Sequence, residues 1–376
     1  MKAACGGSHS FRIPNSEFRI PHSEFCIMEV PDMKKLLAVL LLAALLLPSF
    51  AMAQEVVNVF NCEDYIADEV LDLFEKETGI KVNYMNYTGN EDMLVSLYAN
   101  PGAYDVVFPS EYCVERLLAS GDLSEINYDN IPNAQYVLPS LRDPSYDPGN
   151  AHSVPYMWGT VGILYNTKMV DEPVDSWGIL WDDKYVNNVI MIDSIRDSLG
   201  ITLKYMGHSM NTRDIFALEE ATMMLIDQKQ RGIVKAYQLD ETKDKMVAGE
   251  AALAVVYSGD AQYAIDLNPD LAYAIPKEGS NVWVDCMVIP ATARNKHNAE
   301  VFINFMCRPD IAKMNCEAIR YSSTNTGAIE LMGEAYTSNT TMNPSEESLA
   351  NCEYFNDIQD FLDIYNALWN EVKMAK

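Results

Sequence analysis

Positive charge is scarce in this sequence. Its 376 residues include 27 lysines and arginines against 54 aspartates and glutamates, which gives a formal net charge of -27 at pH 7. An acidic surface repels phosphate backbones and anionic lipid headgroups, so we expect neither a nucleic-acid partner nor a membrane surface as partner. If the protein binds a charged small molecule, a cation is favoured.

The sequence also lacks the short motifs that mark common catalytic and metal sites. It contains no Gly-x-Ser-x-Gly elbow, P-loop, His-Glu-x-x-His, Gly-x-Gly-x-x-Gly or Asp-x-Asp-x-Asp-Gly pattern. No two cysteines are spaced as Cys-x-x-Cys, which disfavours a structural zinc site. We therefore predict no enzyme, no metal and no cofactor. A secreted glycoside hydrolase stays open as a remote alternative, because two carboxylates suffice for that chemistry.

One apolar run stands out, and it lies near the N-terminus. Lys34 and Lys35 precede an apolar stretch from Leu36 to Leu47, and small residues then lead to Ala53. The stretch is too short to cross a hydrocarbon core of ~30 Å, whereas its basic start and small-residue end are typical of a secretory signal. We predict export with cleavage after Ala53. Because no cysteine lies at that point, we expect a periplasmic protein without a lipid anchor.

Residues 1–32 precede the predicted signal peptide at 33–53. They contain a near-repeat, in which Phe11–Glu17 is followed by Phe18–Glu24, and they show no helix or strand period. We interpret 1–32 as a mis-assigned N-terminal extension and Met33 as the initiator. The remainder carries 50 of the 54 acidic residues, so the negative charge belongs to the folded part. It also carries six of the eight cysteines, expected to be mostly small buried apolar residues, with disulfide bridges left open.

Strand-like and helix-like segments alternate after residue 53. Strands are predicted at 56–60, 80–84, 103–108, 189–192, 233–239, 251–257, 271–275 and 282–284. Helices are predicted at 68–78, 111–120, 214–229, 298–306, 310–318 and 358–374, with two more that end at Gly207 and Leu267. This alternation predicts an α/β fold with largely parallel sheets. The length favours two lobes over a single core.

Acidic and aromatic residues collect at the ends of the predicted strands, where open α/β sheets bind their ligands. They are Glu63, Asp64, Tyr65, Tyr112, Asp193, Asp197, Tyr257, Asp260, Trp283 and Asp285, and the polar Ser110 lies among them. The alternative interpretation is helix capping, with Asp64 capping the helix at 68–78 and Asp260 one that begins at Ala261. Asp285 resists that interpretation, because a carboxylate inside an apolar strand is costly unless a cation or strong donors meet it. Together, carboxylates and rings indicate a site for an organic cation.

Six stretches carry a resemblance to a known family. They are Asn61–Tyr65, Phe74–Val82, Tyr104–Ser110, Val154–Gly162, Ile275–Gly279 and Cys307–Lys313. With them the sequence resembles the extracytoplasmic spermidine/putrescine-binding receptors of bacterial polyamine ABC importers. The resemblance implies a two-lobed type II periplasmic-binding-protein fold, each lobe a mostly parallel sheet flanked by helices, with the ligand cleft at the hinge. Lobe 1 would comprise 54–160 and 281–335, and lobe 2 would comprise 161–280 and 336–376.

The same resemblance implies a set of ligand-binding residues. It places Glu63, Asp64 and Tyr65 in a first loop, Ser110 and Tyr112 in a second, and adds Asp197, Tyr257, Asp260, Trp283, Asp285 and Tyr321. Asp193 is a further candidate from its strand end. Three positions depart from the pattern of the family: Cys62 stands in place of Trp, Ser194 in place of an acid, and Phe355 in place of Gln.

We therefore expect a monomeric receptor that performs no chemistry. It would bind putrescine or spermidine by hinge closure and deliver it to the permease of an ABC transporter. The alternative is a binder of the same fold for another organic cation or for ferric iron held by tyrosines. The 21 tyrosines include no adjacent pair, so the sequence gives the iron site no support.

Overall fold

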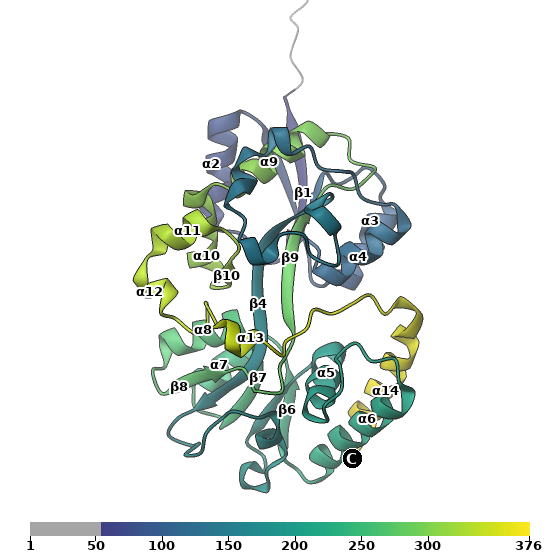
Figure 1. Cartoon of the computed structure of the whole chain (residues 1–376), viewed down its shortest axis with the longest axis vertical. Helices are drawn as coiled ribbons and strands as arrows, with labels where there is room; N and C mark the ends of the chain where they lie inside the picture. The colour runs from purple at the N-terminus through teal and green to yellow at the C-terminus, as the bar shows by residue number, and fades with distance from the viewer. Residues whose placement is uncertain (1–53) are drawn as a thin grey trace, which may run out of the picture. The chain divides into compact units, whose positions relative to one another are not determined.

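The computed structural model of the protein describes residues 54–376 (Figure 1). The predicted extension at 1–32 and the predicted signal peptide at 33–53 lie outside the described residues. Within residues 54–376, none of the helices combines the length and the apolar character that a bilayer crossing requires.

The first part of the described chain alternates strands and helices, as predicted. Its elements are β1 (Val56–Cys62), α2 (Asp68–Thr78), β2 (Lys81–Tyr87), α3 (Asn90–Ala99), β3 (Val106–Val107) and α4 (Glu111–Ser120). β1 pairs in parallel with both β2 and β3, so the predicted strands and the helix between them form a parallel β-α-β unit. α2 ends at Gly79, whose φ of 75° is the left-handed conformation that glycine adopts without steric cost.

A second alternating set occupies residues 189–274. It contains β5 (Val189–Ile192), α5 (Ile195–Tyr205), α6 (Ile215–Gln230), β6 (Val234–Gln238), α7 (Glu241–Val247), β7 (Leu253–Tyr257), α8 (Ser258–Leu267) and β8 (Leu271–Ala274). β5 is parallel to β6 and to β7. Both capping interpretations are wrong: α8 begins at Ser258, so Asp260 lies inside its first turn, and the N-cap of α2 is Ala67 instead of Asp64.

Two strands, β4 (Ser153–Asn166) and β9 (Val282–Val288), run between these two sets (Figure 1). The first half of β4 pairs antiparallel with β9 and β10 (Ser322–Ser323), and its second half with β7 and β8. All antiparallel strand pairs of the described residues involve β4 or β9. The sequence analysis missed β4, because a strand buried on both faces has no polar alternation to reveal it.

The C-terminal part is mainly helical. It contains α9 (Lys296–Met306), α10 (Pro309–Ile319), α11 (Thr326–Met332), α12 (Glu334–Thr337), α13 (Glu346–Leu349) and α14 (Leu362–Met374). Short 3-10 helices fill the longer connections: Tyr128–Asn130, Pro132–Tyr136, Pro139–Leu141, Pro148–Asn150, Trp177–Trp181, Asp183–Tyr185 and Gln359–Phe361. The predicted helix at 358–374 thus begins later, at Leu362, after one 3-10 turn.

Buried apolar side chains form separate clusters around the two sets. One contains Phe74 and Phe108, the second contains Trp177 and Tyr365, and a smaller third lies under α8. Tyr336 and Met342 pack in the first cluster, although the sequence analysis assigned 336–376 to lobe 2. Cys352 and Tyr354 also pack against the first cluster, whereas Phe355 belongs to the second. We therefore propose that the two larger clusters are the cores of two lobes and that the boundary lies between Tyr354 and Phe355. The six cysteines of residues 54–376 are free thiols, four of them buried.

Candidate functional site

The Asp285 carboxylate gathers hydroxyl groups from two other segments. Asp285 lies in β9, and its Oδ2 accepts a hydrogen bond of 2.7 Å from the Tyr65 hydroxyl, in the loop after β1. Its Oδ1 accepts one of 2.6 Å from the hydroxyl of Ser110, the residue that precedes α4. Burial raises the pKa of Asp285, and the two hydroxyl donors oppose that shift. Two hydrogen-bond donors thus offset the free-energy cost that we expected for a carboxylate in an apolar strand.

A second carboxylate, that of Asp197 in the first turn of α5, is likewise surrounded by side-chain hydrogen-bond donors. Its Oδ2 accepts from the hydroxyls of Ser194 at 2.6 Å and Tyr257 at 2.9 Å, and its Oδ1 accepts from the Asn281 amide at 3.2 Å. Only 3% of Asp197 is exposed. Burial raises the pKa of this carboxyl, while the three donors favour its charged form.

Aromatic rings connect the two carboxylates. The ring of Tyr65 is 5.9 Å from that of Tyr321, Tyr321 is 4.8 Å from Trp283, and Trp283 is 6.2 Å from Tyr257, all edge to face. The line from Asp285 through four rings to Asp197 is therefore continuous. We call these six residues the carboxylate–aromatic cluster. The Trp283 Nε1 is buried and has no hydrogen-bond acceptor among the described residues.

Two glycines leave the space that the Trp283 and Tyr321 rings occupy. A Cβ at Gly159 of β4 would overlap the Trp283 ring, and one at Gly259 of α8 would overlap the Tyr321 ring. Neither glycine has a positive φ, so the requirement is for space and not for backbone conformation.

Asp260 lies beside the cluster, one residue after Gly259. Its carboxylate is paired with the ammonium group of Lys243 from α7, with Nζ 3.3 Å from Oδ1. Burial raises the pKa of Asp260, and Lys243 counteracts the shift. Burial raises the pKa of Tyr257 and of Tyr321, and the negative charge of Asp260 adds to both shifts.

Four of the predicted site residues are not joined to the carboxylate–aromatic cluster by any described contact. Glu63 and Asp64 are exposed, Tyr112 donates a long hydrogen bond of 3.4 Å to Glu91, and Asp193 is ion-paired with Lys373 of α14. Asp64 has a φ of 54°, a left-handed conformation that Asp tolerates better than most residues. Their roles in ligand binding remain predictions.

Comparison with known proteins identifies the family. Residues 69–344 match the family model of bacterial extracellular solute-binding proteins, which is well over half of the chain. The protein belongs to this family. A spermidine/putrescine-binding periplasmic protein of Salmonella typhimurium is 32% identical over 345 residues, covering 91% of this chain and 99% of that protein. A protein of the same description from Escherichia coli is 33% identical over 319 residues, covering 84% of this chain and 91% of that one.

Solved structures show the same fold. A spermidine/putrescine ABC transporter substrate-binding protein of Streptococcus pneumoniae superimposes with a TM-score of 0.77 at 35% identity, over 85% of this chain and 99% of that one. A putative spermidine/putrescine ABC transporter protein of Listeria monocytogenes gives 0.80 at 36% identity, over 86% and 100%. The predicted α/β periplasmic-binding-protein fold is confirmed.

The three departures from the family pattern have structural roles of their own. Ser194 is the N-cap of α5, and its hydroxyl donates a hydrogen bond to the Asp197 carboxylate. Phe355 is buried, and the guanidinium carbon of Arg196 lies 4.2 Å from its ring centroid. Cys62 is partly buried, and burial, with Asp285 nearby, raises the pKa of its thiol to about 11. The Cys62 thiol is therefore neutral at pH 7.

Sequence reasoning missed Glu111, a buried residue at the start of α4. Its Oε2 accepts from the Val284 amide of β9 at 3.0 Å, and its Oε1 accepts from the Phe355 amide at 3.3 Å. β3 ends before it can pair with Val284, so the carboxylate supplies the acceptor that a longer strand would provide. Burial raises the pKa of Glu111 to about 8. A carboxylate in a helix first turn is common, so nothing in the sequence distinguished this one.

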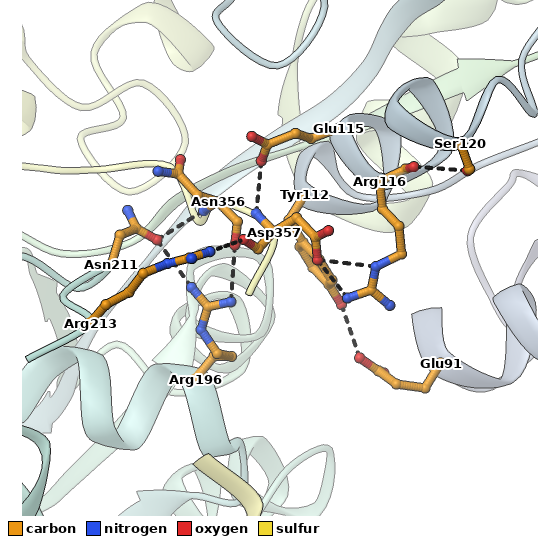
Figure 2. A network of polar contacts seen from close by, with 10 residues as sticks. All are labelled: Glu91, Tyr112, Glu115, Arg116, Ser120, Arg196, Asn211, Arg213, Asn356 and Asp357. Atoms are coloured by element: carbon orange, nitrogen blue, oxygen red, sulfur yellow. Dashed lines mark hydrogen bonds and ion pairs between the residues drawn. The ribbon is translucent and has the colours of Figure 1, made fainter. Parts of the chain in front are cut away.

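Residues 353–357 form a third connection between the two sets, beside β4 and β9. Figure 2 shows the polar network around it: Arg116 of α4 pairs with Asp357 at 2.6 Å, and Arg196 of α5 donates to the Asn356 carbonyl at 3.1 Å. Asn211 accepts from the Asn356 amide at 2.8 Å and donates to the Tyr354 carbonyl at 2.7 Å. Both sets of elements thus hold this segment through charged and amide side chains.

Proposed function

We propose that the protein is an exported receptor for a polyamine, putrescine or spermidine, which it delivers to an ABC importer. The observation that carries the proposal is the carboxylate–aromatic cluster, in which Trp283 lies between the partly buried acid Asp285 and the buried acid Asp197. An alkyl chain with an ammonium group at each end matches this order of acid, rings and acid. The names of the relatives, spermidine/putrescine-binding proteins of two enteric bacteria, support the same ligand class.

The two carboxylates keep capacity for ammonium donors. An ionised carboxylate offers about four acceptor positions. Described residues supply two hydrogen bonds to Asp285 and three to Asp197, so each retains at least one position for a ligand. Charge-assisted bonds to an ammonium would stabilise the ionised forms that burial disfavours. Trp283 and the neighbouring tyrosines would pack against the methylene groups between the charges.

Hinge closure is the proposed binding movement. β4, β9 and residues 353–357 connect the two sets of elements, and the binding residues come from both. A ligand held by Asp285 on one side and Asp197 on the other would favour the closed arrangement through contacts that only this arrangement offers. Binding requires no bond to be broken, and we assign the site no catalytic step.

An iron receptor is the second candidate, and the structure disfavours it. Ferric iron would need tyrosine hydroxyls in the phenolate form. Burial raises the pKa of Tyr65, Tyr257 and Tyr321 well above their usual values, so iron binding at these hydroxyls would have to displace their protons against that shift. Among residues 54–376, no group of three or more His, Cys, Asp or Glu side chains is placed to hold a metal ion.

Calorimetric titration with putrescine, spermidine, spermine, choline and ferric citrate tests the proposal. We expect saturable binding of at least one of the first three amines and none of choline or iron. Absence of heat and of a thermal shift with all three polyamines would reject the proposed function. Cleavage of a glycan panel would instead favour the remote hydrolase alternative.

A further inference from the structure

Asp260 is one of the acids predicted to bind an amine of the ligand, and it is already paired with the amine of a lysine side chain. The Nζ of Lys243 is 3.3 Å from its carboxylate and 5.5 Å from the centroid of the Tyr263 ring. Lys243 comes from α7 and Asp260 from the first turn of α8, and their side chains are only 30% and 18% exposed. The pair is therefore shielded from solvent more than an ordinary surface ion pair.

The surroundings keep Lys243 charged. Burial lowers the pKa of its ammonium group, but the attraction of Asp260, together with Asp240 and Asp244, outweighs burial and leaves the pKa raised. Lys243 thus presents an ammonium group to a carboxylate and an aromatic face. These are the two contacts by which proteins bind an organic ammonium ion.

The Lys243–Asp260 pair lies next to the carboxylate–aromatic cluster. Asp260 follows Gly259, against which the Tyr321 ring packs, and its charge acts on Tyr257 and Tyr321. A polyamine with a further ammonium group near Tyr321 would have to displace Lys243 from Asp260 or bring a second cation beside it. Either event costs free energy that a ligand without this group does not lose.

We propose that Lys243 is a specificity-determining residue: it takes the ammonium position at Asp260 and so favours a short diamine over a longer polyamine with an additional charge. The inference rests on the proposed function. It assigns the ligand's own ammonium groups to Asp285 and Asp197 and removes Asp260 from the set that contacts the ligand directly.

The test compares the affinities for spermidine and putrescine by calorimetry in Lys243→Met, Lys243→Gln and the parent protein. Lys245→Met is the matched control, because Lys245 lies on the same helix and pairs with the uncharged Gln238, with Nζ 2.6 Å from Oε1. We expect the spermidine-to-putrescine affinity ratio to rise about tenfold in both Lys243 variants and to stay within about twofold of the parent in Lys245→Met. In the double variant Lys243→Met/Asp260→Asn this rise of the affinity ratio should disappear, because the carboxylate that would bind the additional ammonium group is gone.

Three results would overturn the inference. If the spermidine-to-putrescine affinity ratio of the folded Lys243 variants stays within about twofold of the parent, the role of Lys243 is rejected and the proposed function stands. An equal gain in the double variant rejects that role as well, because the effect then does not involve Asp260. A parent protein that binds neither amine rejects the proposed function and this inference with it.

Discussion

The indole ring of Trp283 stands edge-on to the phenol ring of Tyr321, with centroids 4.8 Å apart and an interplanar angle of 88°. The pair belongs to the line of rings between Asp285 and Asp197, where we propose that the methylene groups of a diamine pack. Trp283→Leu should therefore weaken putrescine binding about tenfold, or roughly 1.4 kcal/mol, because an apolar side chain without a π face replaces the ring. Trp283→Phe keeps a ring and should lose less. Equal affinities of the two variants in calorimetry would contradict this role.

Asp285→Asn should lower ligand affinity by at least ~2 kcal/mol, because one partner of a buried charged pair is removed. Asp183→Asn is the matched control, since Asp183 is an exposed acid paired with Arg231 and was never assigned to the site. We expect the control to bind within about twofold of the parent. The thermal stability of Asp285→Asn should not fall, because burial raises the pKa of Asp285 and the neutral amide avoids the cost of a buried charge. Equal losses of affinity in the two variants would remove Asp285 from the site.

Glu111 predicts a pH dependence of stability. Its pKa is raised from 4.5 to about 8, so between these values the folded state binds a proton that the unfolded state has released. The free energy of unfolding must then fall as the pH rises through this window. Glu111→Gln removes the titrating group, and its melting temperature should fall less than that of the parent between pH 5 and pH 8, which are about the ends of the window. Parallel melting curves across that range would show that Glu111 does not titrate there.

Gly259→Ala should impair binding through a steric effect. The added methyl group would overlap the Tyr321 ring, which must then leave its present position beside Trp283. We expect a loss of affinity of about tenfold, since small displacements in a binding site are costly. Gly89→Ala is the control, because a Cβ at Gly89 meets nothing within 4 Å. An unchanged affinity in Gly259→Ala would show that the position of the Tyr321 ring is not critical.

The sequence predicted those parts of the fold that carry local signals. The helices at 68–78 and 111–120 were predicted with their correct ends, because an apolar face and a terminal glycine mark each of them. β4 carries no such signal, since burial on both faces removes the alternation of polar and apolar residues. The two capping interpretations failed because helix starts depend on backbone conformation that residue type alone does not fix.

The candidate site was predictable only in part, for the same reason. Asp285 was distinguished by its apolar neighbours in the sequence, and its contacts with Tyr65 and Ser110 agree with the expected need for donors. Lys243 and Glu111 gave no signal, because their partners are set by tertiary packing: Asp260 is 17 residues from Lys243, and Val284 is 173 from Glu111. Resemblance to a family indicates residues that relatives share, and it cannot indicate a lysine that neutralises one of them.

The double role of the Glu111 side chain has a mechanical consequence. One carboxylate accepts from the amides of Val284 and Phe355, which belong to different connections. Neither connection can slide past the other without breaking a bond that is shielded from water. Backbone hydrogen bonds from Val282 to Glu353 and from Glu353 to Ser280 join the same two segments. Any bending of the molecule is therefore coupled across them, and loss of the Glu111 side chain would weaken this coupling without removing it.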